Sequence, residues 1–214
     1  MAAAWDAKAV GSSTPLSITC GGENRCLTVL VISAGNPTTG DVTYNGVSMG
    51  AARYSGSFST LRRNIYRLIA PASGAHNIAV ASGGTLYLIA AHSASGIDQT
   101  TPERSGADIA LTTVASNTTI TRTLTTVAGD LVLTWLNANP TTDPVTIGGD
   151  SHTERHYDGA GVFVMGSAEA TDTDTVVSYS WDGADGAGML SVALAPASGS
   201  TPTAALTFFA EAMA

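Results

Sequence analysis

The chain has 214 residues, which is enough for one large all-β domain or two small ones and enough to bury a core without disulfide bonds. Nine basic side chains oppose seventeen acidic ones, and the net charge of −8 argues against nucleic acid as a ligand, because such binding depends mainly on neutralising phosphates. The sequence starts without a basic segment followed by a long apolar core, and no apolar run reaches the roughly 20 residues that span a bilayer, so we expect neither a signal peptide nor a membrane span.

Short apolar or alternating stretches, separated by pairs such as Gly-Gly, Asn-Gly and Ser-Gly, predict β-strands along the whole chain and almost no helix. In the first half, the predicted strands are residues 16–20, 26–33, 41–44, 47–49, 54–58, 62–69, 76–81 and 85–94. In the second half, they are residues 118–125, 130–137, 145–147, 151–157, 161–169, 175–181 and 188–195. Residues 99–116 are predicted to connect the two sets.

The two sets of strands carry related sequences at an offset of 103 residues, from Asn36 to Asn139. The shared letters are Asn36-Pro37-Thr38-Thr39, Val42-Thr43, Gly46, Ser48 and Tyr54, which return as Asn139-Pro140-Thr141-Thr142, Val145-Thr146, Gly149, Ser151 and Tyr157. Each copy follows an apolar run, residues 27–32 or 131–136. Asn45-Gly46 is typical of a two-residue hairpin turn, because both residues tolerate positive φ, and Gly148-Gly149 is predicted to form the equivalent turn. The sequence therefore predicts two related halves, about residues 16–96 and 118–197.

Cys20 and Cys26 flank Gly-Gly-Glu-Asn-Arg, a turn between two predicted strands. Residues across such a turn can come within disulfide reach, but two cysteines in a chain without a secretion signal are more often free thiols, which we expect here. A zinc site is disfavoured, because it needs four ligands and the chain has no second cysteine pair.

Arg62, Arg63 and Arg67 form the one basic cluster of the sequence. They alternate with apolar residues such as Ile65 and Tyr66, so we interpret them as the solvent-facing side of a strand and not as an anion-binding patch.

Gly46-Val47-Ser48-Met49-Gly50 matches the letters of the nucleophile elbow of serine hydrolases. That elbow needs a strand before the serine and a helix after it. Here Gly46 belongs to a predicted hairpin turn, and residues 51–58 show no helical pattern. We therefore expect no catalytic residues and no enzymatic activity.

His152, Glu154, His156 and Asp158 alternate along a predicted strand and would point to one face, where they could hold a divalent metal or form an acid–base pair. Same-face neighbours on a strand lie about 7 Å apart, which is too far for four of them to close a tetrahedron unless the strand bends. The first copy has no such ligand set at this position. We favour a solvated strand face and expect no metal and no other cofactor.

A resemblance to a known family rests on four motifs. They are Ile65-Tyr66-Arg67-Leu68, Pro71-Ala72-Ser73-Gly74, Gly96-Ile97-Asp98-Gln99-Thr100-Thr101-Pro102 and Ala128-Gly129-Asp130-Leu131-Val132-Leu133. They resemble jelly-roll-type β-sandwich domains of tailed-phage virion proteins and bacterial surface proteins, over about residues 16–196. The resemblance implies an all-β, non-enzymatic module that packs against or adheres to another surface. We predict an antiparallel β-sandwich of jelly-roll type over residues 1–197 with both halves on one core, the alternative being two sandwiches split near residue 105.

The leading functional hypothesis is a virion structural protein of a tailed phage, made in the host cytoplasm, that decorates the capsid or forms a small appendage. Its expected partners are further copies of itself, for which the resemblance suggests a trimer, and other virion proteins. A carbohydrate-binding or host-adhesion module, with a glycan as partner, is the alternative. The abundant Thr and Ser residues and the missing catalytic set fit both hypotheses.

The C-terminal segment, residues 198–214, follows the last predicted core strand and turns apolar at Leu206, Phe208, Phe209 and Met213. Exposed phenylalanines of this kind are typical anchors of interfaces between proteins. We expect these four side chains to form a docking arm that binds a neighbouring subunit or a particle shell, and a fold back onto the chain's own sandwich is the alternative.

Overall fold

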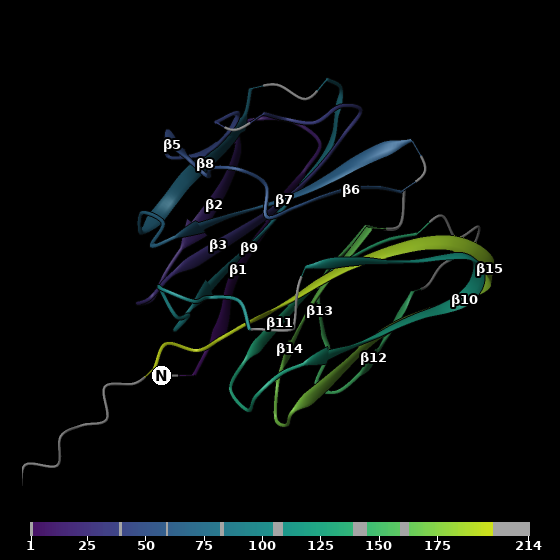
Figure 1. Cartoon of the computed structure of the whole chain (residues 1–214). Helices are drawn as coiled ribbons and strands as arrows, with labels where there is room; N and C mark the ends of the chain where they lie inside the picture. The colour runs from purple at the N-terminus through teal and green to yellow at the C-terminus, as the bar shows by residue number, and fades with distance from the viewer. Residues whose placement is uncertain are drawn as a thin grey trace, which may run out of the picture.

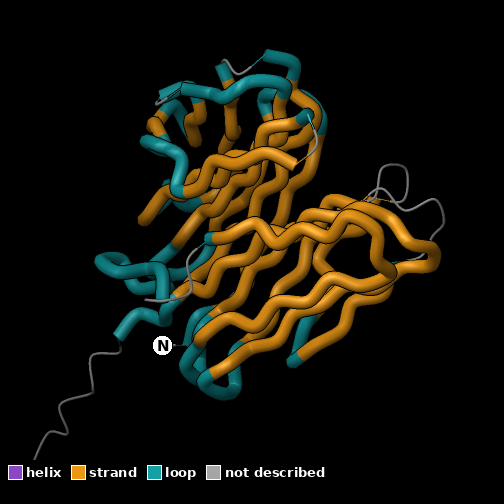
Figure 2. Tube along the Cα trace, turned by 45° about the vertical axis from the view of Figure 1, so that its right-hand side comes forward, coloured by secondary structure: helices purple, strands orange, loops and turns teal. Residues whose placement is uncertain are grey.

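The computed structural model describes residues 2–38, 40–58, 60–81, 84–104, 109–138, 145–158 and 163–198. Within these ranges the chain forms fifteen β-strands and no helix (Figure 1, Figure 2). The strands belong to three sheets, and all their pairings are antiparallel. The prediction of an all-β antiparallel fold is confirmed.

The first half of the chain forms two of the sheets. The larger has the strand order β1-β9-β3-β7-β6 and the smaller has the order β2-β8-β4-β5. The bounds are β1 Ala4–Gly11, β2 Leu16–Cys20, β3 Cys26–Ser33, β4 Val42–Tyr44, β5 Val47–Ser48, β6 Tyr54–Phe58, β7 Leu61–Ile69, β8 Gly74–Val80 and β9 Leu86–Ser95.

The second half forms one sheet of six strands, with the order β10-β15-β11-β14-β13 and with β12 paired to β15. The bounds are β10 Ala110–Thr125, β11 Leu131–Ala138, β12 Thr146–Gly149, β13 Thr153–Asp158, β14 Phe163–Glu169 and β15 Asp174–Leu194. The first part of β15 pairs with β12 and its last part with β11, so the sheet curls into a nearly closed barrel (Figure 1).

The five-strand row of the first half has the order β1-β9-β3-β7-β6, and the main row of the second half has the order β10-β15-β11-β14-β13. In the second half β10 and β15 are long strands, and β12 pairs with the earlier part of β15.

Three apolar clusters hold the layers together. One lies inside the first half, between its two sheets, and includes Ile18, Val29 and Ile78. Another lies inside the curled sheet of the second half and includes Val132, Tyr179 and others. The third joins the halves, since it packs residues of β3, β7 and β9 against residues of β11, β14 and β15. The large sheets of the two halves therefore face each other across a shared core.

The central strands β3 and β11 are covered on both faces, which explains their continuous apolar sequences. Every residue of β3 is buried, and all but one residue of β11. Leu30 and Trp135 face the cluster between the halves, while Val29 and Val132 face the interior of their own half. A strand with two buried faces loses the usual alternation of apolar and polar residues. The prediction that Trp135 belongs to the core is confirmed, because only 1% of its surface is exposed.

The hairpin predictions have different outcomes in the two halves. Asn45 and Gly46 both have positive φ and connect β4 to β5, as predicted. Gly148 and Gly149 instead lie inside β12, opposite Ser178 and Val177. The turn prediction at Gly148-Gly149 is therefore wrong, because pairing with β15 continues the strand to Gly149 and displaces the turn to Asp150-Ser151.

Two strand segments were not predicted from the sequence. β1 precedes residue 16, and β10 starts at Ala110, inside the segment 99–116 that was expected to be a connection. Both segments form outer strands, β1 against β9 and the start of β10 against the last part of β15. The residues of β1 are mostly half-buried, so their sequence has no clean apolar alternation.

The interpretation of the arginine cluster on β7 is correct only for Arg62, which is exposed. Arg63 is buried with 2% of its surface exposed, and its Nη2 donates a hydrogen bond to Asn137 Oδ1 of the second half. Burial lowers the pKa of Arg63 to about 10. Arg67 is also buried and forms an ion pair with Glu103. The layer formed by the second half covers this strand, which its own sequence does not indicate.

Candidate functional site

Ser48, the serine of the elbow-like motif, lies in the exposed two-residue strand β5. β5 pairs back onto β4, and no helix follows it in the described part of the chain. The Ser48 hydroxyl accepts a hydrogen bond from the backbone N–H of Gly50 at 3.0 Å. The motif therefore has the geometry of a hairpin edge, which does not project a nucleophile from a strained turn.

The predicted row of metal-binding side chains on one strand face is not formed. His152 precedes β13, which begins at Thr153. The pairing of β13 with β14 has a bulge between Glu154 and His156, and a bulge interrupts the alternation of side chains. The side chain of Asp158 lies outside the described residues. In the parts of the chain that are described, no group of three or more His, Cys, Asp or Glu side chains is arranged to hold a metal ion.

His152 instead ties the turn before β13 to the interior of the second half. Its Nδ1 lies 3.0 Å from the carbonyl oxygen of Gly148, and its Nε2 lies 2.9 Å from Thr134 Oγ1. The ring packs edge-on against Tyr179 with centroids 5.0 Å apart. Burial lowers the pKa of His152, which favours the neutral ring that can donate at one nitrogen and accept at the other. These contacts assign a structural role to His152.

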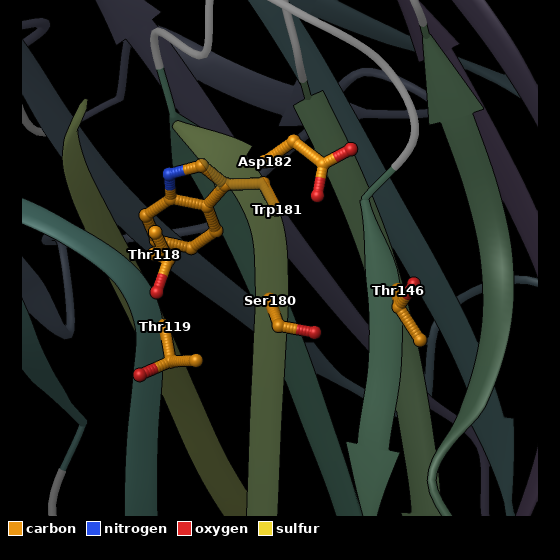
Figure 3. Close-up of a pocket in the computed structure, with 6 residues that line it drawn as sticks. All are labelled: Thr118, Thr119, Thr146, Ser180, Trp181 and Asp182. Carbon is orange, nitrogen blue, oxygen red and sulfur yellow. The ribbon is translucent and has the colours of Figure 1, made fainter. Parts of the chain in front are cut away.

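A depression of about 300 Å³ lies on the second half, between β10, β12 and β15. Figure 3 shows the six residues that line it. A row of hydroxyl groups crosses it, because Thr119 on β10 and Thr146 on β12 both lie opposite Ser180 on β15. Thr118, Trp181 and Asp182 complete the lining. Hydroxyl groups both donate and accept hydrogen bonds, so this surface suits polar ligands such as sugars.

The first half has a depression of about 450 Å³ over β4 and β8. Thr43 lies opposite Ala79 there, just as Thr146 lies opposite Ser180 in the second half. Asn45, His76 and Asn77 supply further polar groups. Each half therefore has a depression that polar side chains help to line.

Among the described residues, Asp182 is the single titratable side chain that lines the depression of the second half, and His76 the single one that lines that of the first half. The described lining of each depression therefore does not pair a general acid with a general base. Trp181 has only 4% of its surface exposed, and its ring belongs to the core of the second half. It offers no open face on which a sugar could stack.

Both cysteines are free thiols, as predicted. Cys20 ends β2 in the smaller sheet and Cys26 begins β3 in the larger one, so the turn between them joins two layers and does not form a hairpin. Both are buried, and burial raises the pKa of Cys26 to about 11. A buried thiol with a raised pKa carries little of the reactive thiolate.

The predicted interface residues Leu206, Phe208, Phe209 and Met213 lie outside the described residues. The last contacts before this segment are made by Pro196 and Ala197. Pro196 forms an isolated antiparallel β-bridge with Ile97, and the N–H of Ala197 donates to the carbonyl oxygen of Gly96 at 2.7 Å.

Comparison with known proteins gives no relative from which to assign this site. No protein-family model matches the chain, and no curated protein and no solved structure is similar enough to count as a match. Among the described residues, none forms a helix with the length and apolar character to cross a membrane.

Proposed function

We propose that this chain is a non-enzymatic structural protein of a virion, which decorates a tailed-phage capsid or forms a small appendage on it. In this proposal each half is a jelly roll, and the two halves arose by duplication. The chain assembles with copies of itself and with other virion proteins, and the particle is its site of action. The repeated order of strands carries the proposal.

The strand order supports the jelly-roll assignment. A jelly roll is a double sheet of eight antiparallel strands in which chain neighbours alternate between the sheets. The first half has β1-β9-β3-β7 in one sheet and β2-β8-β4-β5 in the other, so β1 to β4 and β7 to β9 alternate in this way. Viral capsid proteins and lectins are two classes that use this architecture, and the choice between them needs evidence beyond the fold.

The duplication is supported by strand order and by sequence together. The row of five strands in each large sheet has the same order, and the offset of 103 residues places Val42-Thr43 on Val145-Thr146. Thr43 lies opposite Ala79 of β8 in the first half, and its match Thr146 lies opposite Ser180 of β15 in the second. The matched residues thus pair with corresponding strands.

A structural role also fits the small amount of chemistry on the described surface. Hydroxyl and amide side chains are among the groups that line the two depressions, and the exposed large apolar side chains are only Val47, Tyr87 and Val127 among the described residues. The folded body thus lacks a large apolar docking patch in these ranges. The apolar residues of segment 198–214 are the remaining candidates for assembly.

The decisive test is an inventory of the native particle by mass spectrometry together with deletion of residues 204–214. The proposal expects tens to hundreds of copies per particle. It also expects the shortened protein to remain folded and soluble but to lose assembly. A chain absent from purified particles, or a shortened chain that still assembles, would contradict the proposal.

A carbohydrate-binding or host-adhesion module is the second candidate, and the paired polar depressions favour it. A glycan array with the intact protein separates the two roles. Selective glycan binding together with a few copies per particle supports adhesion, whereas many copies without glycan binding support decoration.

A further inference from the structure

A third depression, of about 290 Å³, lies over β13 and β14. Every side chain that lines it is polar: Ser151, Thr153, Arg155, Ser167, Glu169 and Thr171. Arg155 is the one basic group in this lining and Glu169 the one acidic group. This depression therefore differs from the other two, because it combines hydroxyl groups with a charge of each sign.

Arg155 is the extra residue of the β-bulge in β13, since the pairing with β14 passes from Glu154 to His156 around it. Bulges re-aim side chains and occur preferentially beside functional sites. The Lys8 side chain from β1 of the first half donates to the backbone carbonyl of Arg155. The bulge is thus held by both halves of the molecule.

The Arg155 side chain is also fixed in position. Its Nε donates to Ser167 Oγ at 2.7 Å, and Ser167 has only 1% of its surface exposed. Its Cζ lies 4.3 Å from the centre of the Trp5 ring. Trp5 is itself held, because its indole N–H donates to Nδ1 of the buried His92 at 3.2 Å. A guanidinium fixed in this way loses little conformational freedom when it binds a ligand.

The two outer nitrogens of Arg155, Nη1 and Nη2, donate no hydrogen bond to any of the described residues. Glu169 forms no ion pair with a described residue, but its charge acts on Arg155, because it opposes the lowering of the Arg155 pKa that burial causes. The free edge of a guanidinium matches the two oxygens of a carboxylate in plane and spacing. The hydroxyl groups of Ser151, Thr153 and Thr171 provide further donors and acceptors.

We propose that this depression binds a sugar that carries a carboxylate, such as a uronic acid. The carboxylate pairs with the free edge of Arg155, and the sugar hydroxyls bond to Glu169 and to the surrounding hydroxyl groups. The carboxylate of Glu169 repels any anion in this depression, and it repels a doubly charged ligand such as phosphate more strongly than a singly charged carboxylate. The lining has no apolar side chain that would select an apolar ligand. This site does not depend on the proposed assembly role.

The test is an NMR titration of the intact protein with glucuronate, glucose and inorganic phosphate, read at the indole N–H signal of Trp5 beneath Arg155. Glucuronate is expected to bind with at least tenfold higher affinity than glucose or phosphate. Arg155→Lys keeps the charge but loses the planar edge, so affinity for glucuronate should fall at least tenfold. The matched control Arg62→Lys changes an exposed arginine on β7 outside this lining and should leave binding unchanged.

Glu169→Gln changes an exposed side chain, so the fold should persist even if Arg155→Lys disturbs it. It removes a negative charge from the lining, so it should strengthen phosphate binding by a few fold and reduce the preference for glucuronate over phosphate. Equal affinities for glucose and glucuronate would overturn the proposal. It would also be overturned if phosphate bound the unaltered protein as tightly as glucuronate, or if both control and test variants bound glucuronate normally.

Discussion

The two halves of this protein are built from different numbers of strands, nine in the first half and six in the second among the described residues. The first half contains the separate strands β1, β2, β8 and β9, whereas the second half contains the two long strands β10 and β15. Leu16 pairs with Ile78 in the first half, and Ile120 pairs with Tyr179 in the second. The residues just before them are Pro15 and Thr119, and only Thr119 continues the pairing, since proline has no N–H to donate to a ladder.

This difference shows two ways in which a chain can pass from one sheet layer to another. One strand can end before the next begins, or a single strand can bend. β10 remains one strand, but its pairing with β15 is irregular between Val114 and Thr119. Such irregularities bend a strand and increase its twist. The order of strands in both halves is therefore set by which apolar faces must be buried. The local sequence decides only whether the chain breaks or bends on its way between the layers.

The largest expected effect comes from the core that joins the halves. Trp135 has 1% of its surface exposed and packs against His92 with ring centroids 5.2 Å apart. We expect Trp135→Ala to lower the free energy of unfolding by about 3–5 kcal/mol, because it leaves a large cavity. Denaturant unfolding measures this loss.

Trp135→Phe is the matched variant for that cavity and should cost clearly less, because the phenyl ring fills part of the space. Val127→Ala, at a side chain with 49% exposure, should change stability by less than about 0.5 kcal/mol. Two separate unfolding transitions in the unaltered protein would show that the halves do not share one cooperative core.

A second comparison uses Gly46, which lies in a hairpin turn, and Gly149, which lies at the end of β12. A Cβ atom on Gly149 would lie 2.2 Å from the carbonyl oxygen of Val176, and Gly149 also has a φ of +100°. A Cβ atom on Gly46, which has a φ of +75°, would meet nothing within 4 Å. We expect Gly149→Ala to cost about 3 kcal/mol and Gly46→Ala about 1 kcal/mol. Equal losses in thermal unfolding would mean that β12 relaxes around the added methyl group.

Acid should destabilise the contact between the halves through His92. Burial lowers the pKa of His92 in the folded protein to about 3 from an ordinary value of 6.5. Below pH 6.5, His92 therefore binds a proton in the unfolded chain but not in the folded protein. The contribution of His92 to the free energy of unfolding is fully present above pH 6.5 and is lost as the pH falls. The loss is about 1.4 kcal/mol per pH unit, or roughly 2 kcal/mol between pH 6.5 and 5.

Denaturant unfolding at several pH values tests the role of His92. His92→Gln should make the free energy of unfolding depend less steeply on pH between pH 6.5 and 5. Some dependence should remain, because burial also lowers the pKa of His152. An unchanged slope in His92→Gln would assign the acid sensitivity to other groups.

The smallest expected effect concerns the ion pair of Arg53 with Glu103. The side chain of Arg53 is 52% exposed, and its Nη2 lies 2.6 Å from Glu103 Oε2. Exposed ion pairs contribute little, so Arg53→Ala should cost less than about 1 kcal/mol and the loss should shrink further in high salt. Arg67→Ala, which removes the buried partner of the same carboxylate, should cost more. Thermal unfolding of the two variants measures both losses of stability. Their ratio shows how much more the buried pair of Arg67 with Glu103 contributes than the exposed pair of Arg53 with Glu103.

The sequence by itself determined the features that depend on neighbouring residues. The apolar runs 27–32 and 131–136 predicted buried strands, and both became central strands of the large sheets. Asn45-Gly46 predicted a hairpin turn, because these two residues tolerate the positive φ values that the turn requires. The residue types in the turns and strands were therefore enough to predict an all-β fold.

Only the tertiary structure decided the features that depend on residues far apart in the chain. Gly148-Gly149 looks like a turn in the sequence, but pairing with β15 holds it in a strand. Arg63 reads as a surface residue, but the second half covers it and supplies Asn137 as its partner. The bulge that presents Arg155 to Trp5 joins residues 150 positions apart in the sequence. Such contacts arise only when distant strands meet, because local patterns specify strand and turn but not the partner across the sheet or the layer above it.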